Sequence, residues 1–198
     1  EPRLGRSRIC WEFSKTLPQS ECYVLELTCE AHHRHEALYP LSGMLRRLLC
    51  LSPSDPPDRC HARLGALLGR IKMDPEPVFH LLAPLVEPPM TTPPPSGDPS
   101  EVLQDTLLGL IYRMCEDRPV ALVAEDLHHA DIATLALLEA LVAESAAVPL
   151  LSLFSARAPF SAPWPSVDVI PLAVPALTED APWELLEQLS ADLDLSEA

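Results

Sequence analysis

Residues 120–131, VALVAEDLHHAD, decide the fold class of this chain. The uninterrupted apolar run from Val120 to Ala124 is typical of a strand that is buried on both faces of a parallel sheet. It ends at Glu125 and Asp126, so two acids stand at the carboxyl end of the predicted strand. Open α/β sheets bind their ligands at this edge. The segment therefore predicts an α/β fold and a candidate site.

The two acids have two interpretations. Carboxylates at the end of a buried strand are costly unless something keeps them ionised. A hydrated magnesium ion does this in many nucleotide-binding proteins. Alternatively, Glu125 and Asp126 only mark the point where the strand emerges into solvent. These two residues alone leave both interpretations open.

Apolar patterns on either side predict the other elements. We expect strands over 23–29, 148–157 and 167–177. Helical spacing predicts helices over 41–51, 61–71, 78–87, 101–117, 131–144 and 178–193. Residues 87–100 are so rich in proline that they predict an irregular loop inside one domain. The alternation of strands and helices again indicates an α/β fold with a parallel sheet.

Composition excludes several kinds of partner and site. The 198 residues suit one domain, and their apolar runs are interrupted well before the roughly 20 residues of a membrane span. A net charge of −15 argues against direct binding to nucleic acid. The six cysteines include no C-x-x-C pair, which argues against a zinc ribbon or a redox dithiol. They are typical of reduced thiols in a cytoplasmic protein.

Residues 125–135, EDLHHADIATL, resemble a specific signature. The stretch is similar to EDLHWAD..TL of the AAA+/STAND signal-transduction ATPases, which occur in multidomain bacterial regulators such as class III adenylate cyclase fusions and LuxR-type activators. The resemblance implies a P-loop NTPase-like, three-layer fold in which this stretch is the Walker B strand. It also implies that Glu125 binds magnesium and that Asp126 orients the attacking water. His129 stands where the family usually has tryptophan.

Other segments extend the resemblance over essentially the whole chain. CEAHHRHEALYP at 29–40 is similar to the family's segment after its second strand. SLFSARAPFSAPWP at 152–165 is similar to a strand that ends in an arginine, so Arg157 matches a sensor-like arginine that detects the γ-phosphate. Residues 170–189 match the closing strand and helix.

The first nine residues, EPRLGRSRI, align with the family's phosphate-binding loop, GEPGIGKSRL. The alignment implies that Gly5, Arg6, Ser7 and Arg8 hold the phosphates of ATP, and that Ser7 and Glu125 hold Mg²⁺. Arg6 replaces the usual lysine and Arg3 replaces a glycine, so this Walker A motif is degenerate. A planar guanidinium does not fit a pocket shaped for a compact ammonium group. We expect weakened nucleotide binding and poor hydrolysis.

The resemblance places the central first strand before Glu1 and a helical lid after the last helix. Residues 1–198 are therefore expected to form a single, truncated AAA+/STAND ATPase-like domain whose sheet lacks that strand. We predict an ATP-binding regulatory switch of a bacterial signal-transduction protein, with the nucleotide and the attached sensor and output domains as partners. The alternative is a pseudo-ATPase that serves as a scaffold or binds a partner protein.

Histidines and tryptophans offer further candidates. A zinc site at Cys29, His32, His33 and His35 is a third possibility, although adjacent histidines point apart on a helix or a strand. Either His128 or His129 could face the nucleotide, but packing or capping is the simpler role for both. Trp164 and Trp183 are most simply packing aromatics.

Overall fold

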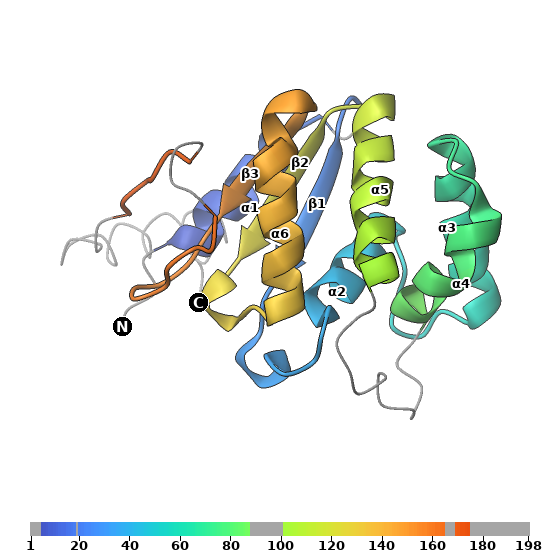
Figure 1. Cartoon of the computed structure of the whole chain (residues 1–198), viewed down its shortest axis with the longest axis horizontal. Helices are drawn as coiled ribbons and strands as arrows, with labels where there is room; N and C mark the ends of the chain where they lie inside the picture. The colour runs from blue at the N-terminus through green and yellow to red at the C-terminus, as the bar shows by residue number, and fades with distance from the viewer. Residues whose placement is uncertain (1–4, 19, 88–100, 165–168, 175–198) are drawn as a thin grey trace, which may run out of the picture.

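The computed structural model describes residues 5–18, 20–87, 101–164 and 169–174. Its centre is a parallel sheet in the order β1-β2-β3. The strands are β1 (Tyr23–Thr28), β2 (Val120–Glu125) and β3 (Leu150–Phe154). In register, Leu25 of β1 lies opposite Leu122 of β2, and Leu122 lies opposite Ser152 of β3. Helices flank this sheet, so the predicted α/β, P-loop NTPase-like fold class is confirmed (Figure 1).

Six α-helices surround the strands in the described part of the chain. They are α1 (Arg6–Thr16), α2 (Tyr39–Leu48), α3 (Pro57–Arg70), α4 (Pro75–Val86), α5 (Glu101–Asp117) and α6 (Ile132–Glu144). Short 3₁₀ turns are η1 (Ala31–His33), η2 (Leu127–His129) and η3 (Ser145–Ala147). The helices predicted between residues 41 and 144 all form. Figure 1 shows α6 in front of the sheet and α1 behind it, with α3 and α4 together beyond α5.

β2 lies at the centre of the sheet and of the hydrophobic core. Val120 to Ala124 are all buried, as their uninterrupted apolar run predicts. The apolar stripe of α5 packs into the same core at helical spacing, through Leu107, Leu110, Ile111 and Met114. This packing fixes the position of β2, and therefore the positions of Glu125 and Asp126 at its carboxyl end.

One predicted strand is wrong where the structure describes it. Residues 169–174, within the expected strand 167–177, have no strand pairing. Ile170 and Leu172 are 85% and 75% exposed, and Pro171 between them has no N–H to donate to a ladder. The helix predicted over 178–193, Trp183 and most of the proline-rich segment lie outside the described residues. Trp164 is buried with its ring centroid 5.1 Å from that of Phe154, as a packing aromatic should be.

The three strands are contiguous, and each is hydrogen-bonded to the next. A further strand could therefore join only at the free edge of β1 or of β3.

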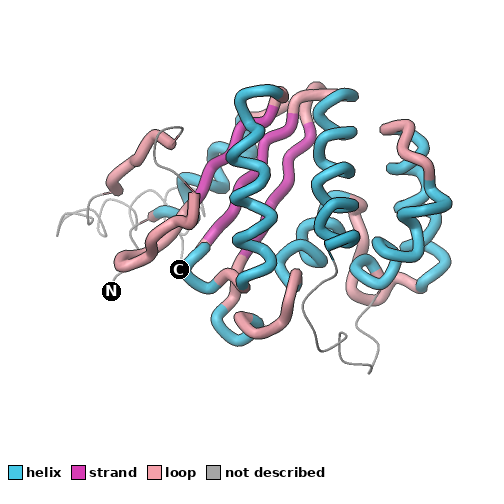
Figure 2. Tube along the Cα trace, in the orientation of Figure 1, coloured by secondary structure: helices cyan, strands magenta, loops and turns pink. Residues whose placement is uncertain are grey.

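Figure 2 shows that the chain leaves β1 and β2 through loops and 3₁₀ turns at one edge of the sheet. At the opposite edge, Leu17, Val120 and Leu150 line a shallow apolar hollow that is remote from these turns. None of the described helices is long and apolar enough to cross a membrane.

Candidate nucleotide site

The carboxyl edge of the sheet brings together the ends of all three strands. Thr28 at the end of β1 lies opposite Glu125 at the end of β2, and Ala124 lies opposite Phe154 at the end of β3. The next backbone N–H along β1, that of Cys29, donates to the carbonyl of Glu125 at 3.0 Å. Glu125 is thus fixed in the ladder, with its side chain at the ligand-binding edge that the sequence predicts.

Ser155 fixes the turn that follows β2. Its hydroxyl accepts a hydrogen bond from the N–H of Asp126 at 3.1 Å. Its own N–H donates to the carbonyl of Ala124, and its carbonyl accepts from the N–H of Leu127, both at 2.9 Å. Asp126 has a φ of 55°, a left-handed conformation that is uncommon outside glycine but that aspartate adopts more readily than most residues, and these hydrogen bonds hold it there. Sequence reasoning missed Ser155, although it immediately precedes the predicted Ala156-Arg157 strand end.

Asp131 is the last residue of the same segment, and its carboxylate makes hydrogen bonds that hold the local structure. Its carboxylate accepts from the N–H of Thr134 at 3.0 Å and from the hydroxyl of Thr134 at 2.5 Å, which caps α6. It also accepts from the N–H of Leu38 at 3.3 Å, at the start of α2. Asp131 is only 7% exposed. We therefore assign it to holding the loops together rather than to the ligand. The D-x-x-T spacing was the signal that could have found this cap.

The basic segment begins at Gly5, whose φ of 75° lies in the left-handed region where glycine costs least. α1 starts immediately afterwards, and Nη1 of Arg6 donates to the carbonyl of Ala156 at 2.8 Å, just beyond β3. Ser7 lies exposed on the first turn. Arg8 turns to its own helix, where it pairs with Glu12. The structure thus brings Arg6 to the carboxyl edge and leaves the Arg8 side chain outside.

Cys10 shows which face of α1 points at the acids. Burial raises the pKa of its thiol to about 11, and the charges of Glu125 and Asp126 add to the rise. Cys10 follows Ser7 by three residues and Arg6 by four, which places the three on one face of the helix. The first turn of α1 therefore faces the end of β2. Cys10 is a further residue that sequence reasoning missed.

His128 and Arg157 complete the site with two unsatisfied groups. Nδ1 of His128 and Nε of Arg157 are buried, and neither has a hydrogen-bond partner within the described residues. Burial lowers the pKa of His128, as do the charges of His129, Arg157 and Arg6, while Asp126 opposes them. His128 Nδ1 lies 3.8 Å from Oδ1 of Asp126. The Nε–H of Arg157, buried without a partner among the described residues, fits a bound anion such as a phosphate, and carboxylate and hydroxyl oxygens fit Mg²⁺.

A family model for the AAA ATPase domain matches residues 4–154. The chain belongs to this family. The match begins beside Gly5 and ends with β3, so it contains α1, the three strands and both acids at the end of β2. Proteins of this family generally bind ATP and Mg²⁺. No curated protein and no solved structure matches the chain.

The third possibility that the sequence offers, a zinc site at Cys29, His32, His33 and His35, is not assembled as that set among the described residues of this AAA ATPase domain. Cys29 is buried, and burial raises the pKa of its thiol to about 12. His35 is not part of the group of potential metal ligands in the described residues. That group consists of Glu30, His32 and His33, of which Glu30 was not predicted.

Proposed function

We propose that this domain binds ATP with Mg²⁺ at the carboxyl edge of its sheet. The observation that carries the proposal is the meeting of the first turn of α1, the acids at the end of β2 and two unsatisfied buried nitrogens. We infer further that it acts as a cytoplasmic switch module of a bacterial signal-transduction protein of the STAND group. This part of the proposal is supported by the resemblance along residues 125–135 and 29–40.

The chain offers a distinct group for each part of the ligand. The N–H groups of Arg6, Ser7 and Arg8 open a helix and suit phosphate oxygens. The guanidinium groups of Arg6 and Arg157 add charge, and the hydroxyl of Ser7 and the carboxylate of Glu125 are the groups that would hold Mg²⁺. When bound, the ion neutralises charge on the phosphates. Asp126 is the group that would orient the attacking water.

Slow turnover follows from the position of Arg6. Its guanidinium already donates to the carbonyl of Ala156. Phosphate binding therefore has to reorient this planar group, whereas the usual lysine would present a compact ammonium group. The same contact favours the second candidate function, a pseudo-ATPase scaffold that binds nucleotide without hydrolysing it. Both functions require the same binding site, and they differ only in the use of Asp126.

Two measurements on the full chain test this. A fluorescent ATP analogue, titrated with and without Mg²⁺, should bind more tightly with the ion, and Glu125→Gln should remove the difference. Phosphate release should be slow and should fall further in Asp126→Asn. Release that is equal in wild type and Asp126→Asn would favour the scaffold, whereas absence of ATP binding would overturn the proposal.

A further inference from the structure

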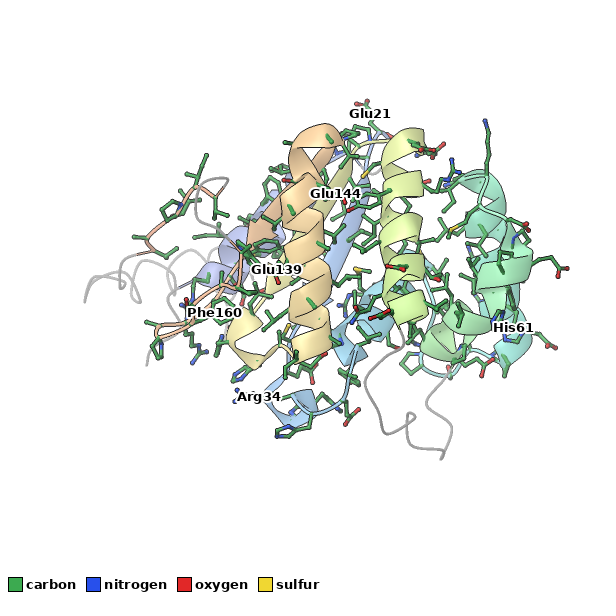
Figure 3. All side chains as sticks on the ribbon, viewed as in Figure 1. Glu21, Arg34, His61, Glu139, Glu144 and Phe160 are labelled. Carbon is green, nitrogen blue, oxygen red and sulfur yellow. The ribbon has the colours of Figure 1, made fainter. Side chains whose placement is uncertain are left out.

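We propose that Glu30, His32 and His33 form a binding site for a transition-metal dication of the Zn²⁺ class. The three residues follow β1 in the turn that contains Arg34, which Figure 3 labels at the carboxyl edge of the sheet. This site uses none of the residues assigned to the nucleotide. Its imidazole nitrogens select Zn²⁺ and its neighbours in the transition series, whereas the oxygen ligands at the nucleotide site suit Mg²⁺.

The distances between the ligand atoms are close to those of a metal centre. One ligand atom from each of the three residues lies within 4.8 Å of the others. Oε2 of Glu30 lies 2.9 Å from Nε2 of His32 and 3.9 Å from Nε2 of His33. Tetrahedral zinc with bonds of about 2.0–2.1 Å separates its ligand atoms by about 3.3 Å. The two separations from Glu30 therefore each need to change by less than an ångström.

Consecutive tight turns bring the carboxylates and His33 to one side of the loop. His33 N–H donates to the carbonyl of Glu30 at 3.1 Å, Glu36 N–H to that of His33 at 2.9 Å, and Tyr39 N–H to that of Glu36 at 3.3 Å. In such i to i+3 turns, the side chains of the joined residues lie nearly above one another. The rings of the adjacent histidines, His32 and His33, nevertheless lie together, with centroids 4.4 Å apart, rather than pointing apart as on a regular helix or strand.

A second layer of contacts fixes the His33 ring. Its Nδ1 donates to Oε1 of Glu36 at 2.8 Å, which leaves the lone pair of Nε2 free for a metal. A carboxylate on the far nitrogen of a metal-binding histidine is the common arrangement, because it sets the tautomer and makes the ligand more basic. Tyr39 stacks on the same ring, with centroids 3.6 Å apart and planes 13° apart. The site is therefore oriented before a metal binds.

The surface position of the cluster gives a metal access to it. The side chains of His32 and Glu30 are 73% and 43% exposed, whereas that of His33 is 25% exposed. With three protein ligands, zinc keeps a fourth position for water or for an external ligand. The partly buried, oriented His33 thus anchors the ion, and the two more exposed groups close around it.

Isothermal titration with Zn²⁺ alone tests the proposal on the full chain without nucleotide. A Cys50→Ser background removes the exposed thiol as a competing ligand. We expect one ion per chain, and an affinity that Glu36→Gln lowers by about 10- to 100-fold. Glu30→Gln and His33→Gln should lower it further. His32→Gln changes a mostly exposed side chain, so it should lower affinity and leave the fold intact, as circular dichroism would verify.

His35→Gln is the matched control, since it removes a histidine of the same loop that lies outside the cluster. Unchanged affinity in this variant, with loss in His32→Gln, supports the site. Absence of Zn²⁺ binding in the Cys50→Ser chain, or equal loss in His35→Gln and His32→Gln, overturns it. ATP titration of the same preparation reports separately on the proposed nucleotide function, so the two proposals can fail independently.

Discussion

The two halves of the candidate nucleotide site are held in different ways. The acidic segment, residues 125–131, is hydrogen-bonded to β1 through Cys29, to the end of β3 through Ser155 and to α2 through Leu38. Among the described residues, the basic segment, residues 5–8, makes one side-chain hydrogen bond to a distant segment, from Arg6 to the carbonyl of Ala156. The acidic half is therefore organised by the fold, whereas the basic half has donors left for a ligand. Mutations in the first should cost stability, and mutations in the second should change binding.

Asp131→Ala should show the largest effect. It removes the cap of α6 and leaves the N–H groups of Thr134 and Leu38 without their partner in a buried site. A lost cap and a buried unsatisfied donor together cost about 3 kcal/mol of unfolding free energy. Urea denaturation measures this loss. A loss of this size would confirm that Asp131 anchors the acidic segment in the fold.

Asp74→Ala provides the matched comparison. Asp74 caps α4 through the N–H of Glu76 at 3.1 Å, but this bond is exposed to solvent. Its loss should cost about 1 kcal/mol, because water can replace the carboxylate. Equal losses in Asp131→Ala and Asp74→Ala would contradict the difference in anchoring.

Arg6→Lys should change binding more than stability. Loss of the bond to Ala156 is offset by solvation of the ammonium group, so the unfolding free energy should change by less than about 0.5 kcal/mol. A compact ammonium group should fit the phosphates better and tighten ATP binding about tenfold, or about 1.4 kcal/mol. Titration with a fluorescent ATP analogue measures the change. Unaltered affinity would show that the guanidinium binds phosphate as well as lysine does.

Much of this arrangement can be predicted from sequence where one short pattern determines it. The apolar run from Val120 to Ala124 predicts a buried strand, and the structure has β2 there. Glu125 and Asp126 then fall at the ligand edge by topology alone. Helical periodicity likewise predicts α2 to α6. These features depend on local sequence and on the general geometry of parallel sheets.

Contacts between segments that are distant in sequence could not be predicted in this way. Ser155 supports Asp126 across 29 residues, and Asp131 binds Leu38 across 93 residues. No spacing rule indicates such pairs. The zinc alternative named Cys29, which instead continues the β1 ladder into the core, whereas the turn after β1 places Glu30 beside the histidines. Over its described residues, 169–174, the strand expected at 167–177 does not form, because apolar character alone does not supply a neighbouring strand.

Two serines of the β3 region test the acidic anchor on a smaller scale. Ser155→Ala removes the acceptor for the N–H of Asp126 and should cost about 1 kcal/mol. Ser152→Ala is the control, because its buried hydroxyl has no hydrogen-bond partner within the described residues. Removing it should leave stability unchanged or slightly raised. A larger loss in Ser152→Ala than in Ser155→Ala would contradict the assigned role of Ser155.

His128 should give the smallest effect, and only at acidic pH. Burial lowers its pKa from 6.5 in the folded protein, so the unfolded chain binds more protons below that pH. Stability is therefore full above the ordinary value and falls as pH drops from 6.5 toward the lowered pKa. His128→Gln removes the extra proton uptake, so urea denaturation should give a shallower decline in this window. The difference in stability between variant and wild type should be constant above pH 7 or so. If both proteins decline equally below that pH, burial and the neighbouring charges of His129, Arg157 and Arg6 do not lower the pKa of His128.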